Sequence, residues 1–329
     1  MSQTTPATPD TMDRPLLGIA LMLGFCAVIP LGDAVAKILS TRIPVGQIVF
    51  VRFAAQGIIL APVALMLGIS LRLPARIMPI VLLRTVLQMA GITAMFMALR
   101  FLPLADAVAI AFVMPFIMLL LGKYILKEEV GLRRLAACVV GFCGTLLVIQ
   151  PSFAEVGLNA CWPLAVALIF SLFMMVTRRI ARETDPIAIQ AVSGGIACGL
   201  MAVLFLLGRV FEVAELDITL PARPEINLLL LAGVLGTIAH LMMTWSLRYA
   251  PTSTLASMQY LEIPMAVLVG WLFFAELPNA MAACGILLTM AAGLYAVMRE
   301  RKVSREARLS AAQQAQSPPA ATGLPASPE

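Results

Sequence analysis

A glutamate, Glu262, stands near the middle of a hydrophobic stretch that runs from Trp245 to Glu276. A charged side chain at that depth in a bilayer is costly, so an intramembrane carboxylate usually has a function. Gln259 lies one turn earlier on the same helical face and Tyr260 is adjacent, so hydrogen-bonding partners are close in the sequence. We therefore expect Glu262 to bind substrate, or to exchange a proton as a cavity opens to each side in turn. The alternative is a structural role, in which an arginine or hydrogen bonds hold the carboxyl group permanently.

Two arginines, Arg52 and Arg84, also lie inside apolar runs. An arginine stays charged at any relevant pH, so each needs a carboxylate, a set of carbonyl oxygens or an anionic ligand group. Asp33 and Asp106 are the candidate partners of Arg52, and Gln88 lies one turn deeper than Arg84. A structural ion pair is the simpler interpretation for both arginines. If they bind substrate instead, the substrate carries a carboxylate, a phosphate or a carbonyl-rich ring.

Asp33 and Lys37 are four residues apart, so they share one face of a helix and can neutralise each other. Pro30 and Gly32 precede them and can open the helix towards a cavity. Lys37 can also extend its ammonium group to the membrane interface. The sequence supports local pairing and substrate contact equally.

His240 is the only histidine of the chain, with Thr244 one turn on and Trp245 beside that threonine. Histidine changes charge readily near physiological pH, but we expect a lone membrane histidine to be a hydrogen-bonded packing residue. Trp245 and Tyr260 are expected in the interfacial belts. If they face a cavity instead, they favour a flat aromatic substrate by stacking. The six cysteines show no paired metal spacing, so neither a metal site nor a cofactor is expected.

The composition excludes a soluble protein. Of 329 residues, 61% are hydrophobic and only 12% are charged, with a mean hydropathy of +0.96. The formal charge of +5 arises from basic residues in short loops, so no nucleic-acid partner is expected. Nucleotide-binding loops and metalloprotease motifs do not occur in the sequence, which counts against an ATP-driven pump and against membrane proteolysis. Energy for any transport would come from a gradient.

Runs of about 20 apolar residues are long enough to cross a bilayer as helices. Ten such runs predict an all-α polytopic membrane protein with five helices in each half. The positive-inside rule places both termini in the cytoplasm, namely a tail at 1–14 and a second tail at 300–329. The second tail is expected to be disordered because it is rich in Ala, Pro, Gln and Ser. The predicted helices are 16–39, 46–68, 78–99, 104–125, 132–150, 161–177, 186–207, 226–246, 252–274 and 279–298.

The two halves, 15–151 and 160–299, are predicted to be repeats of one unit. An odd number of helices in each unit inserts the second unit upside down relative to the first, as in many secondary transporters. Glu262 has only Val113 or Met114 as its counterpart, so this carboxylate is not part of the shared scaffold. The matching residues are Arg100 and Arg248, Pro103 and Pro251, and Glu128 and Glu276, all 148 apart, with Pro115 and Pro264 149 apart.

These motifs resemble the EamA-type repeats of the drug/metabolite transporter superfamily. The resemblance rests on the Leu-Arg-aromatic-x-Pro segments, the mid-helix prolines, the closing glutamates and the glycine-rich helices that follow them. It implies ten helices with a substrate cavity at the midplane, lined by helices one to four and six to nine. Two departures are that Lys127 replaces the glycine usual before the closing glutamate, and that Glu262 is not a general feature of the family. The glycines concerned are Gly141, Gly144, Gly285 and Gly293.

The resemblance implies a multi-pass secondary transporter in a bacterial inner membrane, which moves a small molecule by alternating access and contacts membrane lipids. Within the family, metabolite or amino-acid export and uptake of riboflavin or S-adenosylmethionine both stay open. The small-residue faces at 141–144 and 291–293 make a homodimer possible. Two other classes carry less weight: a non-transporting scaffold or sensor, and a membrane-embedded enzyme.

Overall fold

The computed structural model describes residues 14–114, 116–117, 120–121, 132–181, 183–250, 255, 258–292, 294–295 and 298. All regular structure in these residues is helical, and six helices are long and apolar enough to cross a membrane. Three shorter apolar helices also occur in the described part, and one of them is Ala280–Ala292. The labelled elements are α1 (Pro15–Ser40), α2 (Val45–Met66), α3 (Met78–Phe101), α4 (Leu104–Ala111), α6 (Leu132–Val156), η1 (Gly157–Cys161), α7 (Trp162–Ala181), α8 (Pro186–Val210), η2 (Ala214–Leu216), α9 (Arg223–Tyr249) and α11 (Glu262–Phe274).

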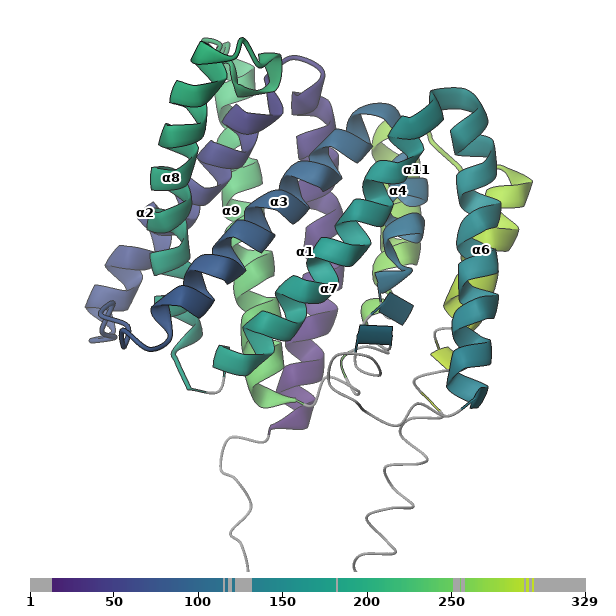
Figure 1. Ribbon diagram of the computed structural model, residues 1–329, viewed down its shortest axis with the longest axis horizontal. Coiled ribbons are helices and arrows are strands. Elements are labelled where there is room, and N and C mark those ends of the chain that lie inside the picture. Colours follow the sequence, from purple (N-terminus) through teal and green to yellow (C-terminus); the bar gives the residue numbers. More distant parts are fainter. Residues whose placement is uncertain are drawn as a thin grey trace, which may run out of the picture.

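The helices run up and down between two ends of the bundle (Figure 1). We call one the Lys37 end: α1, α3, α8 and α11 finish there, and α2, α4 and α9 begin there. We call the other the Arg76 end, where α3 and α8 begin. Short connections join the helices at both ends, so the described residues form one helical layer of about the thickness of a bilayer.

Helix packing follows the two-repeat pattern. The most extensive contacts join α1 to α9, α2 to α8 and α3 to α7. Helices α1 and α7 are the first helices of their repeats, and α3 and α9 are the third. The α1–α9 pair and the α3–α7 pair are therefore counterparts. The α2–α8 pair is its own counterpart, and its helices approach closely where Gly57 meets Gly194. A Cβ atom on Gly194 would lie 2.7 Å from the backbone nitrogen of Gly57, so a larger residue would push the helices apart.

Eight of the ten predicted helices lie within a few residues of observed ones, but two predictions of continuous helices are wrong. The prediction 104–125 is broken, because α4 ends at Ala111 and residues 112–113 form a turn. The prediction 252–274 is broken by a turn at residues 260–261, after which α11 begins.

A proline explains each break. Pro115 and Pro264 stand four residues after Ala111 and Tyr260 in the sequence. A proline has no N–H to donate to the carbonyl four residues earlier, and its ring clashes with that carbonyl. The predicted segments at 122–131 and 251–254, which include Lys127, Glu128 and Pro251, lie outside the described residues, as does Pro115.

One of the small-residue faces that suggested a homodimer, at 141–144, packs inside the chain. A Cβ atom on Gly144 of α6 would lie 2.6 Å from the Thr289 hydroxyl, and one on Gly285 would lie 2.6 Å from the carbonyl oxygen of Gly144. The helix at 280–292 therefore packs on α6 through these residues. Part of the 141–144 face thus has a partner within the chain, and the homodimer stays a prediction.

Candidate functional site

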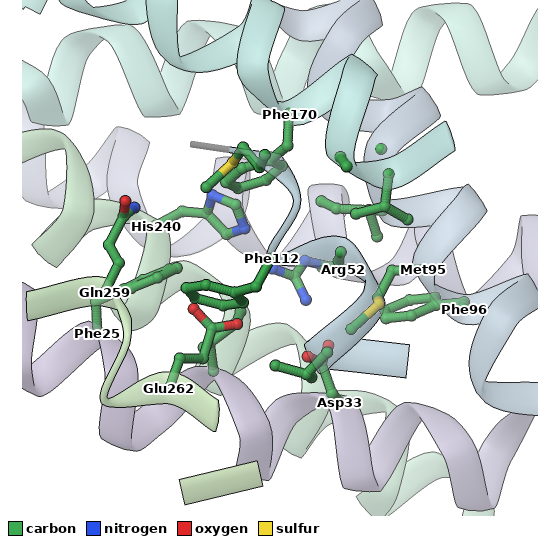
Figure 2. A pocket seen from close by; sticks show the side chains of 18 residues that line it. Phe25, Asp33, Arg52, Met95, Phe96, Phe112, Phe170, His240, Gln259 and Glu262 are labelled. Atoms are coloured by element: carbon green, nitrogen blue, oxygen red, sulfur yellow. The ribbon is translucent and has the colours of Figure 1, made fainter. Parts of the chain in front are cut away.

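A cavity lies between the two repeats, beside both helix breaks (Figure 2). Side chains from α1, α2, α3, α4, α7, α9 and α11 line it, and its empty space of about 670 Å³ includes a part open to the outside. Concave sites between helices of a bundle, with a few polar groups on an apolar wall, are where small ligands bind. Five of the predicted site residues line the cavity: Asp33, Arg52, His240, Gln259 and Glu262.

Glu262 is the first residue of α11, directly after the turn in the second broken helix. Its side chain is partly exposed, and its carboxylate lies beside the ring of Phe112 in the cavity (Figure 2). Among the described residues, none forms an ion pair or hydrogen bond with this carboxylate. Within the described part of the chain, Glu262 thus has no permanent partner of the kind that the structural interpretation needs.

Neighbouring helices bind the carbonyl groups at both helix breaks. The Cys26 thiol of α1 donates to the carbonyl oxygen of Met258 at 3.5 Å. The Ser171 hydroxyl of α7 lies 3.1 Å from the carbonyl oxygen of Met114 and shares its proton between this acceptor and the carbonyl oxygen of Ala167, at 2.6 Å in its own helix. Because α1 and α7 are the first helices of their repeats, each repeat supports the break of the other. Irregular backbone at membrane depth is stable where it is buried in protein or lines a cavity in this way.

Arg52 projects from α2 against α9, where its guanidinium group occupies the place that a side chain at Gly236 would take. A Cβ atom there would lie 2.6 Å from Cζ of Arg52. Arg52 also lies over the ring of Phe96 at 5.9 Å and interacts electrostatically with Asp33. The described residues provide no carboxylate in an ion pair with Arg52 and no acceptor for its Nη2, so the predicted structural ion pair is not formed there.

His240 is buried and surrounded by aromatic rings. Phe25, Phe170 and Phe173 pack edge-on against its imidazole at 6.2 to 6.3 Å. Its Nδ1 has no hydrogen-bond partner within the described part of the chain. The amide of Gln190 donates to the backbone carbonyl of His240 at 2.9 Å, which fixes α9 at this level. The imidazole is therefore available to a ligand, whereas the backbone around it is not.

The aromatic wall of the cavity consists of phenylalanines, which the sequence did not single out. Trp245 packs between α2 and α8, outside the cavity. Tyr260 is buried at the break with its ring 5.4 Å from that of Phe112. Fifteen phenylalanines occur in the chain, so composition alone could not show which of them meet. The four that line the cavity are Phe25, Phe96, Phe112 and Phe170.

Lys37 does not pair with Asp33, and this local prediction is wrong. Its ammonium group lies 2.6 and 2.7 Å from the carboxylate oxygens of Glu276 and donates to the carbonyl of Leu102 at 3.0 Å. Lys37 lies one turn nearer the C-terminal end of α1 than Asp33 does. It is therefore level with Glu276, which follows α11. The same carboxylate accepts the backbone N–H of Leu104 at 3.2 Å and thereby caps α4. The sequence does point to Glu276 in one way, because a closing glutamate recurs in both repeats.

Arg84 and Gln88 lie outside the cavity, in a separate polar cluster between α3, α7 and α8. Arg84 donates to the hydroxyls of Thr177 and Ser193, each at 3.1 Å, and to Gln88 Oε1 at 3.3 Å. No carboxylate of the described residues pairs with it, so the predicted ion pair is again not formed. The arginine is fully buried.

Comparison with known proteins gives consistent results. The profile described as the EamA-like transporter family matches residues 16–150 and 158–298. A riboflavin transporter of Rhizobium johnstonii is 28% identical over 68% of this chain and 72% of its own length. An S-adenosylmethionine uptake transporter of Rickettsia prowazekii is 22% identical over 89% and 96%. A riboflavin transporter of Vibrio cholerae is 24% identical over 90% and 97%.

A solved crystal structure shares the fold. It superposes with a TM-score of 0.59 at 18% sequence identity and covers 88% of this chain and 98% of its own. At this identity the likeness concerns the arrangement of helices alone. The matched length of both chains agrees with a single transmembrane unit built from two repeats.

Proposed function

The chain belongs to the EamA-like transporter family, and from this membership we propose that it carries a small, flat metabolite across a bacterial inner membrane by alternating access. The cavity between the repeats is the proposed substrate site. Transport, rather than catalysis, agrees with the names of the relatives.

One observation carries the proposal: a cavity at membrane depth in which a carboxylate without a described partner, Glu262, stands at the break of a helix. Broken helices at the interface of inverted repeats are where secondary transporters bind their substrates and coupling ions. An unpaired carboxylate in this position is available to a substrate or to a proton. We propose that Glu262 is the residue that couples binding to the gradient.

Riboflavin is the first candidate substrate. Its flat ring system would stack between the phenylalanines of the cavity wall, and its carbonyl and hydroxyl groups would meet Arg52, His240 and Gln259. Arg52 Nη2 and His240 Nδ1, which have no acceptor or donor among the described residues, would gain partners from such a ligand.

S-adenosylmethionine is the second candidate, and a specific observation favours it. The cavity holds two carboxylates, of Asp33 and Glu262, against the single guanidinium group of Arg52. This surplus of acidic groups favours a ligand that carries positive charge as well as a flat ring. The two candidates therefore differ in whether Asp33 and Glu262 bind a cation.

The membrane topology is also proposed. Ten spans with the Lys37 end outside place both termini in the cytoplasm, in agreement with the excess of basic residues in the loops at the Arg76 end. In this orientation the Lys37–Glu276 ion pair lies on the outer side. A reporter fused to the C-terminus tests the topology, since a periplasmic signal would contradict an even number of spans.

The experiment that tests the function is thermal unfolding of the purified protein with riboflavin, S-adenosylmethionine and a panel of amino acids. A ligand that binds the folded state raises the midpoint by mass action. Uptake of the stabilising compound into proteoliposomes then follows, with Glu262→Gln beside the wild type. A panel in which no compound shifts the midpoint or enters the vesicles would refute the proposed substrate class.

A further inference from the structure

Arg52 and Arg84 both belong to the first repeat, but each lies at an interface with the second repeat, and these two interfaces correspond to each other. Arg52 is the eighth residue of α2, counted from the Lys37 end, and Arg84 is the seventh of α3, counted from the Arg76 end. At 1.5 Å per residue, the Cα atom of each arginine lies about 10 Å from its end of the bundle. The two arginines thus lie at mirrored depths.

The helix contacts of the two arginines correspond as well. Arg52 lies between α2 and α9, against Gly236. Arg84 lies between α3 and α8, hydrogen-bonded to Ser193. Since α2 and α8 are the second helices of their repeats and α3 and α9 the third, these two interfaces are counterparts. Each guanidinium group also lies over a phenylalanine ring and has a glutamine one turn on, Gln56 or Gln88.

The Arg84 cluster has hydrogen-bonding capacity that the described residues do not use. Arg84 Nη2 and Gln88 Nε2 have no acceptor within the described part, and both side chains are fully buried. The two groups are hydrogen-bonded to each other, so both unused donors belong to one cluster. A guanidinium group with no carboxylate beside it and an amide with a free NH₂ together match a carboxylate or another oxyanion.

One aromatic layer separates this cluster from the cavity. Arg84 lies over the ring of Phe173 at 4.9 Å, and that ring is 5.0 Å from Phe170 and 6.2 Å from His240. Both Phe170 and His240 line the cavity, whereas Phe173 does not. A rearrangement of the rings on α7 would open the Arg84 cluster to the cavity.

We propose that Arg84, Gln88, Thr177 and Ser193 form a second, oxyanion-binding subsite, which opens when the cavity opens towards the Arg76 end. The inference rests on the proposed transport function: in inverted repeats, exchange of the two conformations exchanges the environments of corresponding interfaces. Arg52 lines the cavity in the present conformation and Arg84 is enclosed. In the opposite conformation Arg84 faces the substrate path and binds the carboxylate of a substrate that carries one, as S-adenosylmethionine does.

The test measures the charge preference of a thiol introduced at this subsite. Ser193→Cys protein, full-length and in lipid nanodiscs, is treated with anionic methanethiosulfonate ethylsulfonate or with its cationic ethylammonium counterpart. Peptide mass spectrometry follows modification at position 193 alone, so the native cysteines do not interfere. Each reaction is run with and without the compound that stabilises the protein.

We expect the anionic reagent to react about tenfold faster than the cationic one, because a buried positive charge concentrates anions. Arg84→Lys in the same protein keeps this preference, and Arg84→Gln reduces the ratio to about one. A ratio of one with Arg84 present, or a ratio that Arg84→Gln leaves unchanged, overturns the subsite. An absence of modification under all conditions also overturns the subsite. If Ser193→Cys fails to fold, the same measurement is made on Thr177→Cys.

Transport by the wild-type protein is measured from the same preparation. If the protein transports a panel compound but shows no charge preference at position 193, the subsite is refuted and the proposed function stands. If it transports nothing, the proposed function fails, while the labelling ratio still reports whether Arg84 forms an anion site.

Discussion

In the first repeat the helix break at residues 112–113 is followed by Met114, whereas in the second repeat the break at 260–261 is followed by Glu262. The two turns fall at corresponding positions, because 112 plus 149 is 261. A first helix of the opposite repeat binds a carbonyl at each break, through Cys26 in one case and Ser171 in the other. The backbone arrangement is therefore common to both repeats, and the carboxylate is present in only one.

This difference separates scaffold from chemistry. A broken helix provides free backbone groups and a point at which two half-helices can move, and both repeats need this for a symmetric change of access. A titratable group is needed only once for each transported molecule. The comparison predicts that substitutions at the carboxylate abolish function, whereas those at the common features alter mobility or stability.

The largest expected effect comes from Glu262→Gln, which keeps the shape of the side chain and removes its charge. We expect uptake into proteoliposomes to fall by about tenfold or more, which corresponds to about 1.4 kcal/mol, and to lose any dependence on an imposed proton gradient. Glu225→Gln, at the start of α9 outside the cavity, is the matched control. Equal transport by both variants would show that the carboxylate at the break is dispensable.

Pro264→Ala tests whether the break itself matters. Alanine provides the N–H that can bind the carbonyl of Tyr260, so the helix can continue through residues 260–261. We expect transport to fall severalfold while the protein gains thermal stability. Pro62→Ala in α2, where the helix is continuous, is the control and should change transport little. A Pro264→Ala protein that transports normally would separate transport from the broken helix.

Glu276→Gln tests how the first broken helix is held at the Lys37 end. This carboxylate binds Lys37 and caps α4, so its neutralisation should lower the free energy of unfolding by about 2 kcal/mol. Glu183→Gln removes the exposed ion pair with Arg76 at 3.3 Å and should cost less than about 1 kcal/mol. Denaturant titration of both variants measures the difference, and equal losses would contradict a special role for the Lys37 end.

The smallest expected effect comes from Ser171→Ala, which removes the hydrogen bond to the carbonyl of Met114. We expect a loss of about 1 kcal/mol in the free energy of unfolding. Ser246→Ala is the control, because the Ser246 hydroxyl donates only within its own helix, to Met243. If the two serines prove equivalent, support of the break by α7 contributes nothing measurable to stability.

Several features of the fold could be predicted from the sequence because they depend on local composition. Long apolar runs gave α1, α2, α3, α7, α8 and α9 to within a few residues, since a helix that crosses a bilayer must satisfy its own backbone groups. The offset of 148 residues gave the repeat. The same prolines that revealed the repeat also mark the breaks, but hydropathy alone predicted helices that continue through them.

The site was harder to predict because its members come from several helices. Glu262, Gln259, Arg52, His240 and Asp33 were selected as polar groups in apolar spans, and all five line the cavity. The partner of Lys37 was missed because Glu276 is 239 residues away in the sequence. Arg84 was assigned to the same set of polar contacts, although Phe173 separates it from the cavity.

By itself, the sequence determined that this chain lies in a membrane, that it contains two repeats of one unit and that one unit carries an additional carboxylate. These properties follow from hydropathy, charge and repetition along the chain. Only the tertiary structure decided which charges meet, which phenylalanines form the wall and which of the two arginines faces the cavity. The physical reason is that a polar side chain in a membrane is satisfied by whichever helix packs against it, and helix packing depends on shape across the whole bundle.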